Sequence, residues 1–143
     1  MKRIVIFVVL ILVGLAAWFG LKEYNRKNKD LAGEQAALTI NAADLIAAFE
    51  KDSASANKTY VDKVVAVTGR VNNINTDGNP VIITLGEEGK MSTVQCSMDS
   101  THASDYKSIA VGGNAKLKGM CTGAFSDPMF GTNVQLNRCV IQK

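Results

Sequence analysis

Residues 64–74 read Val64-Val65-Ala66-Val67-Thr68-Gly69-Arg70-Val71-Asn72-Asn73-Ile74, and this stretch decides the fold of the chain. Its β-branched residues predict a long strand, because branched side chains pack well on a pleated sheet. Gly69 interrupts the run, and a glycine inside a strand often marks a bulge or a sharp bend. A long strand that bends in this way is what a small barrel needs in order to curl.

Four more strands are predicted on the C-terminal side of this run. Asp77-Gly78 is a strong hairpin signal, and glycine-containing turns separate the later segments. The expected elements are strands at 81–85 and 93–98, a short helix at 102–108, and strands at 115–123 and 133–141. Three strands, a helix and two strands is the order of the OB-fold, a five-stranded Greek-key barrel. The predicted fold class is therefore an all-β OB-fold.

A helix is expected before the first strand and should pack on the barrel. Asn41 is a good N-cap for a helix through residue 50, in which Leu45, Ile46 and Phe49 fall on one face. Residues 53–60 are expected to add a second short helix.

An uninterrupted apolar segment occupies residues 4–21. As a helix rising ~1.5 Å per residue it would span ~27 Å, close to the hydrocarbon thickness of a bilayer. Lys2 and Arg3 precede it, and Trp18 and Phe19 lie where an interfacial aromatic belt is expected. These features predict a single transmembrane helix.

A cleaved signal peptide is the competing interpretation of this segment. Such a peptide has a shorter apolar stretch followed by a polar region with a small-x-small cleavage site. Gly14-Leu15-Ala16 is a poor candidate for that site, because Trp18 and Phe19 follow it. No cysteine lies near the end of the segment, which argues against a lipoprotein anchor. We therefore expect an uncleaved signal-anchor.

The predicted organisation is a short basic N-terminus at 1–3, the anchor at 4–21, a polar tether at 22–40 and the OB-fold domain at 41–143. Basic residues flank both ends of the anchor, so the positive-inside count is nearly balanced. A short basic N-terminus before an apolar run is the usual form of an export signal. We therefore expect a single-pass protein of the cell membrane with an extracytoplasmic (periplasmic) domain.

The charged residues are unevenly placed along the chain. Residues 1–40 hold six of the 16 Lys/Arg and three of the 13 Asp/Glu, which leaves ten of each in residues 41–143. The basic excess therefore lies beside the anchor, where it can meet anionic headgroups, and the folded body is neutral.

Several motifs together resemble a known family. They are Ala43-Asp44-Leu45 with Phe49-Glu50, residues 60–71, Val94-Gln95-Cys96, residues 118–123 and residues 134–141. The sequence is similar to the tRNA_anti-like OB-fold family, found in membrane-anchored or lipid-anchored exported bacterial proteins. The resemblance covers about residues 40–142. It implies the fold, but no catalytic residues and no established ligand.

No enzyme constellation is present in the sequence. His102, the one histidine, has no cysteine or second histidine at ligand spacing, so we expect a solvated loop residue and no metal site. Glu87 and Glu88 are paired carboxylates in a turn, where neighbouring side chains point apart. The glycine turns fit no phosphate-binding pattern. We expect no enzymatic activity and no cofactor.

The favoured function is a non-catalytic binding module that takes a protein of the cell envelope or an oligosaccharide. OB barrels bind such ligands with the loops between strands 1 and 2 and strands 4 and 5, here residues 75–79 and 126–132. Nucleic acid is the alternative. Binding it needs a basic groove and aromatic side chains on which bases stack, and the sequence offers few residues for either. The candidate ligand-binding residues are Arg70, Asn72, Lys90, Gln95, Met129, Phe130 and Arg138.

The three cysteines all fall in predicted strands. If the last hairpin loops over residues 128–132, Cys121 faces Cys139, and this pair is the favoured disulfide in an oxidising compartment. The alternation of Val134 and Leu136 places Cys139 on the other face unless a bulge intervenes. Cys96 is the competing partner of Cys139, and buried free thiols are the third possibility.

We predict that residues 4–21 stay in the mature chain. N-terminal sequencing of the membrane-bound protein is expected to show the intact N-terminus, and a mature start near Ala17 would contradict this. A cytoplasm-active reporter fused after Lys143 is expected to be inactive, and an active fusion would reverse the predicted orientation.

Overall fold

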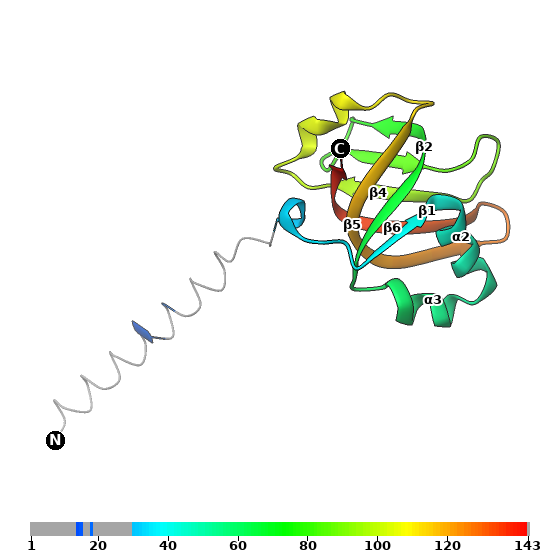
Figure 1. Cartoon of the computed structure of the whole chain (residues 1–143), viewed down its shortest axis with the longest axis horizontal. Helices are drawn as coiled ribbons and strands as arrows, with labels where there is room; N and C mark the ends of the chain where they lie inside the picture. Colours follow the sequence, from blue (N-terminus) through cyan, green and yellow to red (C-terminus); the bar gives the residue numbers. More distant parts are fainter. Residues whose placement is uncertain (1–13, 16–17, 19–29, 143) are drawn as a thin grey trace, which may run out of the picture.

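The computed structural model describes residues 14–15, 18 and 30–142 (Figure 1). The predicted basic N-terminus, most of the predicted anchor and the tether up to residue 29 lie outside these residues. None of the helices in the described part of the chain is long and apolar enough to cross a bilayer.

The described part of the chain contains short helical segments and six strands of four to 14 residues. In chain order, the elements are η1 (Leu31–Gly33), β1 (Leu38–Asn41), α2 (Ala42–Lys51), α3 (Ser53–Tyr60), β2 (Val64–Asn75), β3 (Ile82–Leu85), β4 (Thr93–Met98), η2 (Ala103–Ser108), β5 (Asn114–Asp127) and β6 (Gly131–Gln142). The five predicted strands are β2 to β6, and the two predicted helices before them are α2 and α3. The helix predicted between the third and fourth strands is the 3-10 segment η2.

The strands form a closed barrel. The sheet order is β1-β2-β3-β4-β6-β5, and a further pairing of β2 with β5 closes the ring. The pairing is antiparallel throughout the ring except between β4 and β6, which run parallel. This is the five-stranded barrel expected for an OB-fold.

Strand β2 takes part in three pairings because it is long and bent. Val64 to Arg70 pair with β5 on one edge, and within this half residues 65–68 pair with β1 on the other edge. Residues 71–75 pair with β3. Gly69 lies at the change of partner, where an added Cβ would be 2.8 Å from the Cβ of Ala42. The missing side chain at Gly69 therefore lets the start of α2 pack directly against β2. The bulge of β2 lies further along the strand, between Val71 and Asn73.

Part of the predicted tether is folded against the barrel. Strand β1 pairs in parallel with β2, and η1 precedes it with Leu31 buried. Residues 31–41 are therefore structural, contrary to the expectation of a linker up to residue 40. Four residues with a distant parallel partner leave little local signal in the sequence.

The core fills the barrel and extends under α2. Inward side chains of β2, β3, β4 and β6 meet Leu45, Ile46 and Phe49, the three residues predicted to share one helix face. Alternate positions of β4 are buried, namely Val94, Cys96 and Met98. The residues between them in β4 consequently face outward.

The last hairpin has a different register from the predicted one. The turn is shorter, with Asp127 opposite Gly131, and register shifts follow along the strands, so that Cys121 faces Leu136. Cys139 lies instead beside the competing partner Cys96, whose thiol is hydrogen-bonded to it. All three cysteines are free and buried, and burial raises the pKa of the Cys139 and Cys121 thiols.

We predict that Gly119→Ala destabilises the barrel. An added Cβ at Gly119 would overlap the sulfur of Cys139 and lie 3.2 Å from the carbonyl oxygen of Asn137. Overpacking of this kind costs about 1–3 kcal/mol, measurable as a lower free energy of unfolding in denaturant titrations. Gly78→Ala is the control, because nothing lies within 4 Å of its added Cβ. Equal stabilities of the two variants would contradict the packing described here.

Candidate binding face of the barrel

A row of uncharged polar side chains crosses the outside of the barrel. Asn73 of β2 is opposite Thr84 of β3, Thr84 is opposite Gln95 of β4, and Gln95 is opposite Gln135 of β6. Residues opposite one another in a ladder point to the same face, and the buried neighbours of these four point inward. With strands about 4.8 Å apart, the row spans about 14 Å.

Two neighbouring rows add further amide and hydroxyl side chains together with two apolar ones, Phe125 and Ile82. Asn133 of β6 lies between Thr93 of β4 and Phe125 of β5, and Ile82 of β3 lies between Asn75 of β2 and Ser97 of β4. Amide side chains can both donate and accept hydrogen bonds, and hydroxyl groups do the same. We call the three rows the polar face: Asn73, Asn75, Ile82, Thr84, Thr93, Gln95, Ser97, Phe125, Asn133 and Gln135.

The polar face carries almost no charge. Arg138 is the only charged residue within β3, β4 and β6. Its φ of 53° marks a bulge, and its guanidinium donates to the sulfur of Met120 at 3.3 Å. This predicted ligand-binding residue is half-buried and packs on β5.

The other predicted site residues fall into separate groups. Gln95 lies in the central row of the polar face, and Met129 and Phe130 are exposed at the β5–β6 turn. Arg70 lies near the β3–β4 loop and pairs with Glu88 at 2.8 Å, while Lys90 pairs with Glu87. The basic residues therefore face nearby carboxylates, and they form no common cationic patch.

Asn72 joins the group around the β3–β4 loop. Its side chain donates to the carbonyl oxygen of Glu87 over 3.5 Å, so it supports the loop. Sequence reasoning missed Asn73, Thr84 and Gln135, although the alternation along their strands could have indicated that they point outward.

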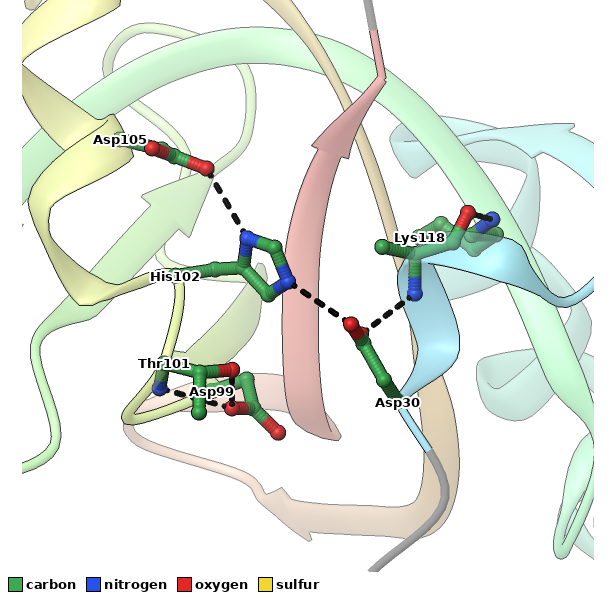
Figure 2. A network of polar contacts seen from close by, with 7 residues as sticks. Asp30, Asp99, Thr101, His102, Asp105 and Lys118 are labelled. Atoms are coloured by element: carbon green, nitrogen blue, oxygen red, sulfur yellow. Dashed lines mark hydrogen bonds and ion pairs between the residues drawn. The ribbon is translucent and has the colours of Figure 1, made fainter.

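A second polar cluster holds the N-terminal segment to the barrel (Figure 2). His102 lies between two carboxylates, with Nε2 3.2 Å from Asp30 and Nδ1 3.3 Å from Asp105. Its side chain is 27% exposed, so the histidine expected to be a solvated loop residue is only partly solvated and has two carboxylate partners. Asp30 in turn accepts the backbone N–H of Ala32 at 2.8 Å and caps η1.

Lys118 of β5 completes this cluster from the other side. The residue is buried, and its Nζ donates to the carbonyl oxygens of Ala32 at 3.1 Å and Glu34 at 2.6 Å. We call Asp30, His102, Asp105 and Lys118 the clasp. No group of three or more His, Cys, Asp or Glu side chains suited to a metal ion occurs within the described ranges.

The clasp changes the proton affinity of His102 and Asp30. Hydrogen bonds to Asp30 and Asp105 raise the pKa of His102. Hydrogen bonds from Ala32 and His102 lower the pKa of Asp30. Asp99 lies close by, and hydrogen bonds from Thr101 lower its pKa. The contacts of His102 with Asp30 and Asp105 are therefore strongest when both carboxylates are ionised and the imidazole is protonated.

The fold agrees with a comparison against known families. The family model described as tRNA_anti-like matches residues 1–140. This chain belongs to the tRNA_anti-like family. No curated protein matches the tRNA_anti-like chain.

One solved structure shares the fold over most of the tRNA_anti-like chain. It is described as a "putative nucleic acid-binding lipoprotein" from Klebsiella pneumoniae subsp. pneumoniae MGH 78578. The match covers 82% of this chain and 100% of that chain, with 18% identity and a TM-score of 0.59. At this identity, the match shows a common fold.

Two other solved structures are more distant from the tRNA_anti-like chain. The OBody NL8 bound to hen egg-white lysozyme has 14% identity and a TM-score of 0.41, over 57% of this chain and 96% of that chain. A "putative aspartyl-tRNA synthetase" from Leishmania major Friedlin has 9% identity and a TM-score of 0.47, over 87% and 25%. Both TM-scores are below 0.5, so these two matches support no statement about the fold or function of this chain.

We predict that the clasp loosens as the pH rises. Because the pKa of His102 is raised by docking, its contribution is complete below its ordinary pKa of about 6.5 and is lost above the raised value. Because the pKa of Asp30 is lowered, its contribution is lost only in strong acid. The melting temperature of the wild type should exceed that of His102→Gln most between about pH 4 and pH 6.5.

In mildly alkaline solution the melting temperatures of the wild type and His102→Gln should become equal. Hydrogen exchange at the amide of Ala32 reports the loosening of the clasp locally. A constant difference in melting temperature from pH 5 to pH 9 would contradict the assignment of the charged imidazole to the clasp.

Proposed function

We propose that this chain is a non-catalytic binding module displayed at a membrane, and that its ligand lies across the polar face. The main support for this proposal is the row of four amide and hydroxyl side chains aligned across β2, β3, β4 and β6. OB barrels place their ligands on the corresponding strands, between the two loops at either side. The loops here are residues 76–81 and the β5–β6 turn.

The chemistry of the face favours a neutral ligand rich in hydrogen-bonding groups. Asn and Gln side chains match the hydroxyl groups of an oligosaccharide and also the backbone of a protein segment. The exposed ring of Phe125 at the edge of the face adds an apolar contact. An oligosaccharide or a protein of the cell envelope is therefore the favoured class of ligand.

Nucleic acid is the second candidate, and a specific observation favours it. The Klebsiella structure with the same fold is described as that of a "putative nucleic acid-binding lipoprotein". Binding a phosphate backbone requires lysine and arginine side chains that release counterions. The ten basic residues of 41–143 are matched by ten acidic ones, and the polar face itself carries none. The neutral ligand is therefore the better supported of the two.

We predict that removing one amide from the central row weakens binding of a neutral ligand. The full chain in phosphatidylcholine nanodiscs would be screened against an array of neutral oligosaccharides, with empty nanodiscs as the blank. For a ligand found in this way, Gln135→Ala should raise Kd about tenfold, because a hydrogen bond is worth about 1 kcal/mol and its loss leaves a ligand group unpaired.

Gln35→Ala removes a matched exposed amide outside the polar face and should leave Kd unchanged. If Gln135→Ala and Gln95→Ala both bound the ligand as strongly as the wild type does, the ligand would not lie on this face.

A further inference from the structure

Four large apolar side chains are exposed together at one end of the barrel. Their exposed fractions are 70% for Met91, 65% for Phe125, 75% for Met129 and 72% for Phe130. They come from the β3–β4 loop, from β5 and from the β5–β6 turn. We call these four residues the apolar tip.

The backbones that carry the apolar tip are adjacent. An added Cβ at Gly131 would lie 3.2 Å from the backbone carbon of Met91, so the turn touches the β3–β4 loop. Phe125 is opposite Asn133, and Asn133 is opposite Thr93. The four exposed side chains are therefore carried by neighbouring segments at this end of the barrel, and clustered exposed apolar residues mark interaction sites in soluble domains.

Hydrogen bonds fix the apolar tip in place. Asp127 accepts the backbone N–H groups of Met129 at 2.7 Å and Phe130 at 3.1 Å. The backbone N–H of Thr132 donates to the hydroxyl of Ser92 at 3.0 Å. The turn is therefore ordered before any partner arrives, which lowers the entropic cost of binding.

A cleft with acidic walls lies beside the apolar tip, between α2 and the β5–β6 turn. Its volume is about 430 Å³, and its lining residues are Phe49, Glu50, Ser53, Ser126, Asp127, Pro128 and Thr132. The lining includes two carboxylates and neither lysine nor arginine. Glu50 accepts from Ser92 at 2.7 Å through Oε1, and Asp127 uses Oδ1 for the turn. The nearby Lys90 is paired with Glu87.

We propose that the apolar tip and the acidic cleft together dock a segment of another protein that carries apolar side chains flanked by lysine or arginine. This inference rests on the proposed function as a binding module and adds a second surface, with a protein partner, to the polar face. Apolar residues of the partner cover Met129 and Phe130, and a cationic side chain enters the cleft. Methionine and phenylalanine are enriched at the centres of protein interfaces, and opposite charges at the rim select the partner.

The position of this surface argues against a membrane as its occupant. The β5–β6 turn lies on the side of the barrel away from η1, the first element of the described barrel domain (Figure 1). Anionic headgroups attract basic surfaces, whereas the cleft beside the apolar tip is acidic. A protein segment meets both the apolar and the acidic part.

The test uses two sets of short fluorescent peptides that have the same leucine and phenylalanine positions. One set carries lysine between them and the other carries glutamate. Binding is measured by fluorescence anisotropy with the full chain in phosphatidylcholine nanodiscs, and empty nanodiscs give the blank. The variants are Met129→Ser with Phe130→Ser, and Glu50→Gln, which keeps the acceptor for Ser92.

The lysine peptides should bind, and the glutamate peptides should not. The double serine variant should raise Kd about tenfold or more, since central apolar contacts dominate interface energies. Glu50→Gln should raise Kd about threefold and reduce its salt dependence. Val111→Ser, which removes another exposed apolar residue elsewhere, should leave Kd unchanged.

Equal binding of both peptide sets, or equal binding by wild type and the double serine variant, would overturn the proposal. So would the absence of lysine-peptide binding. If a neutral oligosaccharide still bound in a Gln135-dependent way, the docking proposal alone would fail. If neither ligand bound, the proposed function would fail with it.

Discussion

The antiparallel pairing of β2 with β5 is the constraint on which the rest of this structure depends. Seven consecutive residue pairs, from Val64 with Met120 to Arg70 with Asn114, close the ring of five strands. Closure fixes which side chains fill the core, and α2 covers part of that core through Leu45 and Phe49. It also removes free edges from the barrel, so the remaining strand surface is available for ligands.

Closure also explains how charge is distributed over the domain. The strands of the polar face contain amides and hydroxyls, whereas lysine, arginine and carboxylate side chains lie mainly in loops and helices and pair locally. Lys90 with Glu87 in the β3–β4 loop is an example. The clasp uses such a pair to join η1 to the barrel, and the acidic cleft leaves carboxylates beside the apolar tip. One neutral domain therefore presents three chemically distinct surfaces.

Most of the fold could be predicted from the sequence, because β-branched runs and glycine turns are local signals. Strand β1 could not, since its four residues gain their stability from a partner 27 positions away. Contacts between side chains that are far apart in the sequence could not be predicted for the same reason. His102 meets Asp30 across 72 positions, and a bulge at Arg138 decides that Cys139 lies beside Cys96. Gln95 was predicted as a site residue, but its partners in the row depended on the observed register.

The central claim is that recognition occurs on a neutral face and does not depend on phosphate. Titration of the full chain with fluorescent single-stranded oligonucleotides over a range of salt concentrations tests this most directly. A variant with glutamine at Lys22, Arg26, Lys27 and Lys29 removes the basic flank beside the apolar segment. The account predicts no saturable binding by this variant at moderate salt. Micromolar binding that weakens steeply as salt rises would contradict it.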